Sequence, residues 1–95
     1  MSNRDVYITK MKLQLDELNL QMAKLEVRAQ EAREDVRATY KAEMSKLHQQ
    51  SKLALSKLEE LQATGETTWD AMVTEMEKIR DAFTHSFSYF KSQVK

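Results

Sequence analysis

The sequence contains no cysteine, no proline and a single glycine, Gly65, among its 95 residues. Without cysteine there is neither a disulfide framework nor a thiolate metal site. Sheets need turns built on glycine, proline or asparagine, and beyond Gly65 only Asn3 and Asn19 offer them, so a multi-stranded fold is excluded. A single glycine also excludes the glycine-rich loops that bind nucleotide phosphates.

An excess of charge of one sign is lacking as well. The chain has 15 basic and 15 acidic residues, which gives a formal net charge of zero, and the two signs are mixed along its length. Nucleic-acid binding depends on a dense positive face, so we expect no nucleic-acid partner. No apolar run approaches the length of a membrane span, and the first residues contain no signal-peptide core. We therefore expect no transmembrane segment and a cytoplasmic protein.

A long apolar pattern typical of helices is present. Apolar positions recur every three or four residues, which is the spacing of a heptad seam. The first part of this seam comprises Ile8, Met11, Leu15, Leu18, Met22, Leu25, Ala29, Ala32 and Val36. Two successive steps of four, from Val36 to Tyr40 and from Tyr40 to Met44, relax a supercoil without ending a helix. The seam then continues through Leu47, Ser51, Ala54, Leu58 and Leu61, weakened by the polar Ser51. The spacing predicts one helix over about residues 3–62.

The pattern stops at residues 63–67, where we predict a turn. Gly65 is the residue that adopts the left-handed backbone of a helix C-terminus without steric cost. Thr67 followed by Asp70 is a variant of the capping box, which predicts a second helix over about residues 68–93. The apolar stripe of this helix comprises Trp69, Met72, Met76, Ile79, Phe83, Phe87, Phe90 and Val94.

These elements predict an all-α fold in a single domain, residues 1–95. We expect an antiparallel helical hairpin, with a long and a short helix, that assembles as a coiled-coil bundle. Folding the short helix back brings Phe90 near Tyr40 and Trp69 near Leu61. The predicted hairpin core comprises Tyr40, Met44, Leu47, Leu58, Leu61, Trp69, Met72, Met76, Ile79, Phe83, Phe87 and Phe90.

The two predicted helices differ in length, about 90 Å against about 40 Å at 1.5 Å per residue. The first half of the seam then lacks a partner in its own chain, so we predict self-association as an antiparallel homodimer. The predicted oligomer interface comprises Ile8, Met11, Leu15, Leu18, Met22, Leu25 and Val36. A second stripe, which recurs every seven residues on the opposite face, comprises Val6, Leu13, Leu20 and Val27. It indicates either a tetramer or a docking surface.

Candidate chemistry is sparse. His48 and His85 fall at similar heights in the hairpin, with Asp81 on the same face as His85, but a metal site needs three or four convergent donors. Carboxylates such as Glu59 and Glu60 would need a desolvated cleft to act as acid and base. We interpret all of these as surface groups and predict no catalytic residue, no metal, no cofactor and no enzymatic activity.

The aromatic run Phe83, Phe87, Tyr89, Phe90 has a second interpretation. An amphipathic helix rich in phenylalanine can lie in a lipid interface or coat a hydrophobic granule. Core packing explains the helical spacing more simply, so lipid or granule binding is our alternative function.

Several short stretches resemble a known family. They are Tyr7-Ile8, Lys10-Met11-Lys12, Gln14-Leu15-Asp16-Glu17-Leu18-Asn19, Gly65-Glu66 and Trp69-Asp70. Together they look like the small bacterial coiled-coil proteins described as stress-response proteins, known from cyanobacteria and proteobacteria. The resemblance implies no activity and no cofactor. We therefore expect a self-associating structural or interaction protein that acts by binding, with a link to stress.

Overall fold

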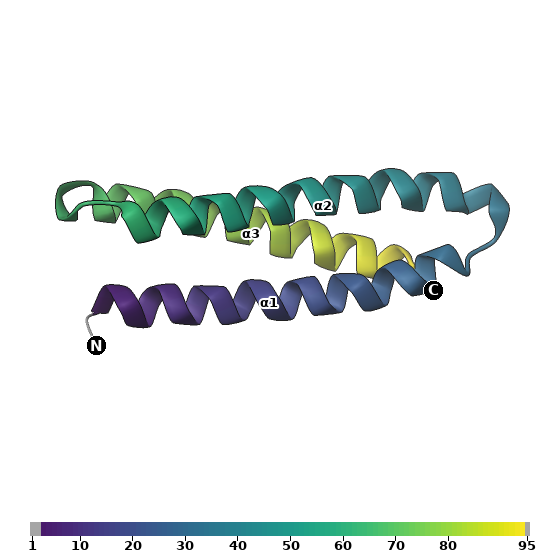
Figure 1. The fold of residues 1–95 in the computed structure, drawn as a ribbon. Helices are drawn as coiled ribbons and strands as arrows, with labels where there is room; N and C mark the ends of the chain where they lie inside the picture. The colour runs from purple at the N-terminus through teal and green to yellow at the C-terminus, as the bar shows by residue number, and fades with distance from the viewer. Residues whose placement is uncertain (1–2, 95) are drawn as a thin grey trace.

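A computed structural model describes residues 3–94 and shows three long helices. They are α1 (Asn3–Gln30), α2 (Glu34–Ala63) and α3 (Trp69–Gln93), with a short 3-10 helix, η1 (Glu66–Thr68), before α3. Helix α2 runs antiparallel to α1, and α3 runs back along α2 (Figure 1). Residues 3–94 contain no strand, so the all-helical, bundle-like class is confirmed. The ends of the predicted domain, residues 1–2 and 95, lie outside the described residues.

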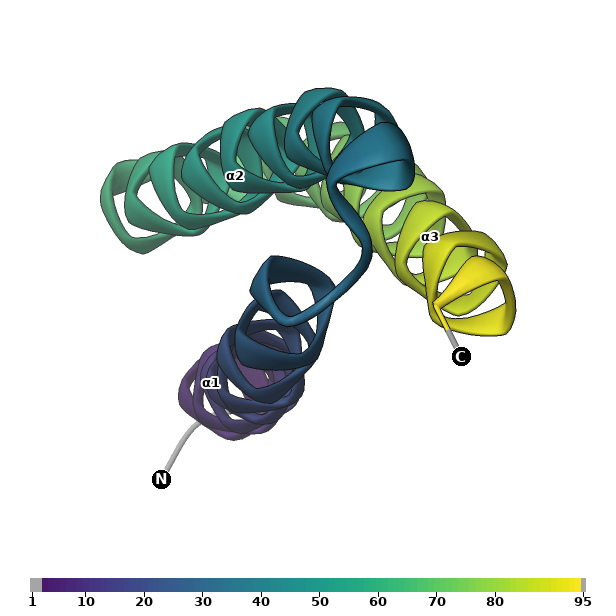
Figure 2. The ribbon, with the colours of Figure 1, turned by 90° about the vertical axis from the view of Figure 1, so that its right-hand side faces the viewer.

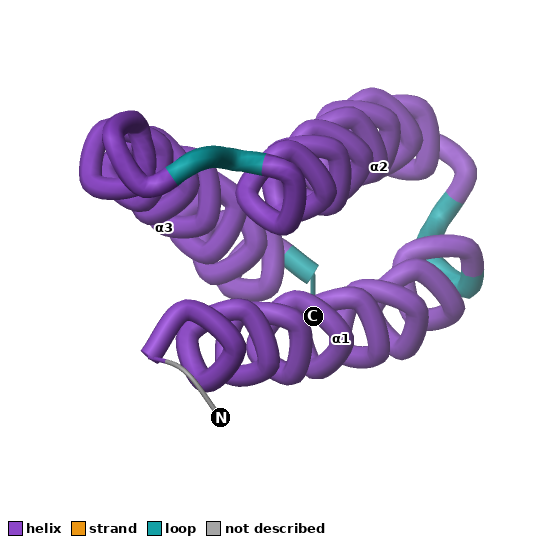
Figure 3. Tube along the Cα trace, turned by 60° about the vertical axis from the view of Figure 1, so that its left-hand side comes forward, coloured by secondary structure: helices purple, strands orange, loops and turns teal. Residues whose placement is uncertain are grey.

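The predicted continuous helix over residues 3–62 is wrong, because the chain turns between α1 and α2 at residues 31–33 (Figure 3). The turn folds α1 back so that its apolar seam is buried within the same chain. Burial of each large apolar side chain contributes about 1.5–3 kcal/mol, which outweighs the few helical hydrogen bonds lost at the turn. The molecule is therefore 51 Å long and not 90 Å.

The turn between α2 and η1 also differs from its prediction. Gly65 has φ −77° and ψ 168°, an extended conformation, and no residue in the described part of the chain has a positive φ. The last carbonyls of α2 accept hydrogen bonds from side chains and from the Thr64 amide, which donates to Leu61 O at 3.2 Å. The Thr64 hydroxyl donates to Glu60 O at 2.6 Å, and the Arg4 guanidinium donates to Leu61 O at 3.3 Å and to Thr64 O. The predicted left-handed glycine cap is therefore absent.

One hydrophobic core runs through all three helices. Helix α1 supplies Met11, Leu15, Met22, Leu25 and Ala29. The other two helices and the residue after α3 supply Met44, Leu47, Ala54, Leu58, Leu61, Met76, Phe83, Phe87, Phe90 and Val94. The partly buried residues that pack against it include Tyr7, Ile8, Leu18, Tyr40, Leu55, Trp69, Met72, Val73 and Ile79. Every residue of the predicted hairpin core therefore lies in the core or against it.

The residues predicted to form an oligomer interface take part in this intrachain core instead. Met11, Leu15, Met22 and Leu25 are buried by α2 and α3, with Ile8 and Leu18 packed beside them. Val36 is the exception, with 37% of its surface exposed. The seam of α1 thus has a partner in its own chain, and the prediction of self-association from an uncovered seam loses its basis.

The three helices are not arranged evenly. Helix α2 packs closely against both α1 and α3, whereas α1 and α3 touch only lightly. Seen along the bundle, α1 stands apart from α3 (Figure 2). Between residues 3 and 94 no helix has the length and apolar character that a membrane crossing requires.

Candidate interaction surface

The outer face of α1 carries four exposed apolar side chains at an exact seven-residue spacing. The exposed fractions are 38% for Val6, 63% for Leu13, 52% for Leu20 and 57% for Val27. At about 100° per residue, this spacing places the four side chains in one row opposite the buried seam of the same helix. We call this row the α1 stripe. Single exposed leucines are common, but here four exposed apolar side chains recur along one face of the helix, about 10.5 Å apart at 1.5 Å per residue.

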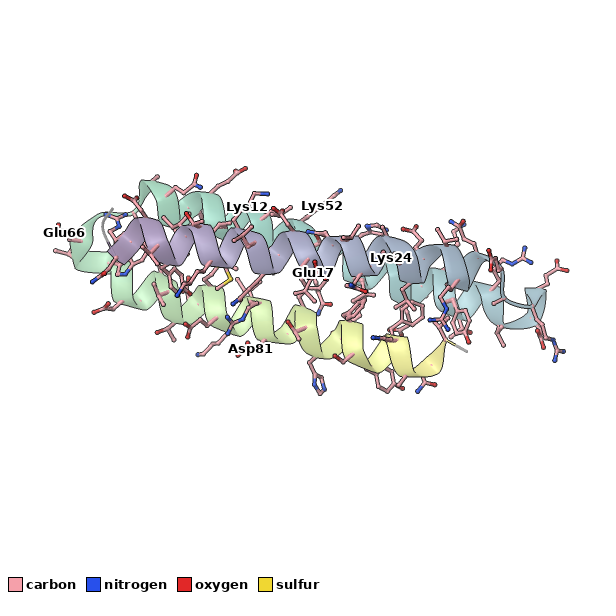
Figure 4. All side chains as sticks on the ribbon, turned by 90° about the horizontal axis from the view of Figure 1, so that it is seen from below. Lys12, Glu17, Lys24, Lys52, Glu66 and Asp81 are labelled. Atoms are coloured by element: carbon pink, nitrogen blue, oxygen red, sulfur yellow. The ribbon has the colours of Figure 1, made fainter. Side chains whose placement is uncertain are left out.

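A row of charges accompanies the α1 stripe. Lys10, Glu17 and Lys24 are exposed and also recur every seven residues, each three or four positions from a stripe residue. Glu17 accepts a hydrogen bond from the Gln21 amide at 2.9 Å, and none of the three makes an ion pair among the described residues. Figure 4, which views the molecule from the α1 side, shows Glu17 and Lys24 along this helix.

An open groove between α1 and α3 adjoins the stripe. Its lining residues are Leu13, Gln14, Glu17, Leu18, Arg80, Asp81 and Thr84. Leu13 therefore belongs both to the stripe and to the rim of the groove. The groove exists because α1 and α3 touch only lightly, and Arg80 spans it by donating to the Gln14 side chain at 3.0 Å.

Polar and aromatic contacts fix the first turn of α1, which sets the direction of the stripe. The Arg4 guanidinium lies 4.6 Å from the centre of the Trp69 ring, a cation–π contact. The Tyr7 ring meets Trp69 edge to face, with ring centres 5.7 Å apart. The Tyr7 hydroxyl donates to Glu77 at 3.4 Å. These contacts attach the start of α1 to the start of α3.

A polar layer crosses the middle of the bundle. The Ser51 hydroxyl donates to the Asn19 side-chain oxygen at 2.5 Å, and the Gln50 amide donates to the Ser86 hydroxyl at 3.0 Å. Buried polar groups need such partners, so this layer favours one axial alignment of the three helices.

At the far end of the bundle, the Tyr40 hydroxyl donates to Gln93 O at 2.8 Å, and the Tyr40 ring contacts Phe90.

Two titratable groups are shifted by their surroundings. Burial, followed by the Glu77 carboxylate, raises the pKa of the Tyr7 phenol. The hydrogen bonds that the Lys57 ammonium donates to Glu60 and then to Glu75, with distances of 2.8 Å and 3.0 Å to their carboxylate oxygens, raise its pKa. Both groups connect α3 to another helix, so we attribute their pKa shifts to contacts that hold the helices together.

The histidines take no part in a cluster of donors. His48 Nε2 lies 3.3 Å from Glu26 Oε2, and His85 is exposed on α3. Within the part of the chain that the structure describes, no three His, Cys, Asp or Glu side chains gather in a way that could hold a metal ion.

Sequence reasoning identified the α1 stripe but missed what surrounds it. The charged row of Lys10, Glu17 and Lys24 was detectable, because its seven-residue spacing matches that of the stripe. The attachment of Arg4 to Trp69 gave no such signal, because the two residues are 65 positions apart and follow no shared pattern.

The fold and surface define an all-helical three-helix bundle with an apolar stripe on one outer helix. No protein-family model matches the chain, and no curated protein or solved structure matches it either.

Proposed function

We propose that this protein is a non-enzymatic, self-associating helical protein with a structural or interaction role. The observation that carries the proposal is the α1 stripe, four exposed apolar residues in one row. A second copy of the chain is the partner we infer, with its own α1 lying antiparallel against this stripe. Pairing would remove both stripes from water, and each buried leucine or valine favours association by up to about 1.5–3 kcal/mol.

The charged row supports an antiparallel homodimer. In an antiparallel pair of identical helices, the same flank of each helix faces its counterpart. If Leu20 packs on the partner copy's equivalent leucine, Glu17 of each chain lies beside Lys24 of the other. If the pair centres on Leu13 instead, Lys10 and Glu17 pair in the same reciprocal way. Opposite charges that meet beside an apolar row stabilise the antiparallel orientation, and they meet in both of these alignments.

Sedimentation equilibrium over a wide range of concentration tests this proposal. We expect the natural chain to form dimers and the double variant L13Q/L20Q to lose at least tenfold in dimer affinity. The matched control is Leu53→Gln on α2, because Leu53 is 54% exposed, like Leu20, but stands outside the stripe. A natural chain that stays monomeric throughout, or an equal loss in the control, would contradict the proposal.

Charge reversal tests the antiparallel orientation separately. Glu17→Lys should weaken the dimer because it places three lysines along the flank. The triple variant K10E/E17K/K24E restores opposite pairs within its own dimer and should recover affinity. If the triple variant dimerises as weakly as Glu17→Lys, the proposed antiparallel pairing is wrong.

The alternative function, binding of lipid or a hydrophobic granule by an amphipathic helix, would require this fold to open. Phe83, Phe87 and Phe90 lie in the core, so α3 would have to leave the bundle to place them in a lipid interface. Flotation with liposomes distinguishes the two functions, because a self-associating bundle stays with the unbound fraction.

The proposal also includes location and context. A cytoplasmic setting fits a chain whose partner is a second copy of itself. The resemblance to bacterial stress-response proteins adds a role under stress, which a change in expression after stress would test.

A further inference from the structure

Residues 31–33 turn the chain between α1 and α2 although none of them ends helices by its nature. Glu31, Ala32 and Arg33 are all compatible with a helix, and alanine and arginine are among its best formers. Helices commonly end on a glycine or asparagine in the left-handed conformation. The chain has neither residue between positions 20 and 64, and no described residue has a positive φ. The local sequence therefore favours a helix that continues through the turn.

The caps at this turn are weak. At the end of α1, the Glu31 amide is shared between Val27 O and Arg28 O, at 3.3 Å and 3.2 Å. Helix α2 begins after Arg33, which has φ −58° and ψ 147° and makes no capping hydrogen bond with its side chain. Serine, threonine, aspartate or asparagine usually occupies this position.

Two side-chain contacts lie at the turn: Arg33 donates to Asp35 Oδ2 at 3.1 Å, and Arg37 contacts the backbone of the turn. The Arg37 guanidinium donates to Ala32 O from two nitrogens, at 3.4 Å and 3.2 Å. In a continuous helix the same carbonyl would accept the amide of Val36, which the turn instead directs to Arg33 O. Arg37 thus compensates for a hydrogen bond that straightening would restore.

Contacts between α1 and the other helices keep the turn closed, and these contacts do not depend on chain connectivity. The face of α1 that carries Met11, Leu15 and Met22 would pack equally well on α2 and α3 of a second copy. The apolar spacing also continues through the turn, from Ala29 to Ala32 and Val36, as a straight helix requires.

We propose that two copies of the chain exchange α1. In each copy the turn at residues 31–33 straightens, and α1 and α2 become one helix over residues 3–63. Because α1 and α2 are antiparallel within one chain (Figure 1), the two long helices of the exchanged dimer run antiparallel. Each α1 then fills the place beside α2 and α3 of the partner copy. The core residues are buried as before, so the balance between the two forms depends on the turn and on protein concentration.

The exchange deepens the proposed self-association but does not use the α1 stripe, which stays exposed in both forms. An experiment can therefore contradict the exchange of α1 without contradicting association through the α1 stripe, and the reverse. All tests of the exchange are made in the L13Q/L20Q background, in which association through the stripe is weakened.

A disulfide test reports the exchange directly, because the chain has no cysteine of its own. Asn19 and Ser51 face one another between α1 and α2, with their side-chain oxygens 2.5 Å apart. One preparation carries Asn19→Cys and the other Ser51→Cys. In the closed monomer neither thiol meets the other chain. After the two are mixed and oxidised, only the exchanged dimer joins a chain of one kind to a chain of the other through positions 19 and 51.

Two variants of the turn complete the test. Arg33→Pro fits the φ of −58° in the turn but blocks a continuous helix, so we expect it to abolish the mixed disulfide. Arg37→Ala removes the contact with Ala32 O and should increase the mixed disulfide severalfold. The matched control, Arg28→Ala, removes an exposed arginine that takes no part in that contact and should leave the yield unchanged.

The circular dichroism of every variant is measured first, so that loss of fold is separated from loss of exchange. A mixed disulfide that Arg33→Pro removes supports the exchange, whether or not the stripe dimer forms. Folded variants that give no mixed disulfide at any concentration would overturn it, and so would a yield that Arg33→Pro leaves unchanged.

Discussion

Arg4 joins the first turn of α1 to both ends of the connection between α2 and α3. Its guanidinium donates to Leu61 O and Thr64 O, two carbonyls at the end of α2, and stacks over the Trp69 ring. A planar guanidinium can do both at once because its donors lie at its edge and its face is free for stacking. A lysine ammonium has no such face. Together with the Thr64 hydroxyl, Arg4 therefore replaces the glycine cap that the sequence pattern predicts at this turn.

Replacement of Arg4 should therefore destabilise the bundle. We expect Arg4→Ala to lower the free energy of unfolding by about 1–2 kcal/mol, because two carbonyls lose a donor and Trp69 loses a cation–π partner. Arg4→Lys should recover less than half of that loss. Urea denaturation measures both, with Arg28→Ala as the control for removal of an exposed arginine, expected within about 0.5 kcal/mol of the natural chain. Equal stability of Arg4→Lys and the natural chain would show that charge alone suffices.

At the scale of the elements, the sequence predicted where helices exist better than where they end. Spacing of three and four identifies a buried helical face, and the faces containing Leu15, Leu47 and Phe83 were recognised in this way. The break at residues 31–33 was missed because no local signal marks it. It follows from burial of one helix against two others, which is a property of the tertiary fold.

The same limit applies to the candidate surface. Seven-residue spacing identified Val6, Leu13, Leu20 and Val27 as a second stripe. The sequence also predicted that the Leu15 side is covered, but by a second copy of the chain, because no local signal indicates that α1 folds back onto its own α2 and α3. The structure covers the Leu15 side and leaves the Leu13 side in water.

The turn that contains Gly65 provides a prediction at this scale. Its φ of −77° is accessible to any residue, and a Cβ added at this position would meet no atom within 4 Å. Gly65→Ala should therefore raise the free energy of unfolding by about 0.4–1 kcal/mol, because alanine reduces the conformational freedom of the unfolded chain. Thermal and urea denaturation give the change. A clear loss of stability would mean that this glycine adopts a conformation closed to alanine.

Across the whole molecule, the numbers of basic and acidic residues are equal. A small number of titratable groups link the helices, and their contribution to stability depends on pH. Tyr7 connects α1 to Glu77 on α3, and Lys57 connects α2 to Glu75 on α3. The fold raises the pKa of the Tyr7 phenol, so it favours the neutral phenol, and it raises the pKa of the Lys57 ammonium, so it favours the charged amine. In both cases the protonated group is the stabilising one. Both contributions are complete below the unfolded pKa values, about 10 for tyrosine and about 10.4 for lysine.

Stability should consequently fall as the pH rises above about 10, through the raised pKa values of the folded state. A Tyr7 phenolate would lose its donor proton and lie next to the Glu77 carboxylate in a partly buried site. Tyr7→Phe removes this group, so the variant should show a shallower loss of stability between neutral and strongly alkaline pH, with Lys57 accounting for part of the slope that remains. Urea denaturation at a series of pH values measures the slope. The matched control is Tyr89→Phe, because Tyr89 is 59% exposed and its removal should leave the slope unchanged. If both variants have the same alkaline slope as the natural chain, the link from α1 to α3 through Tyr7 does not contribute to the stability of the bundle.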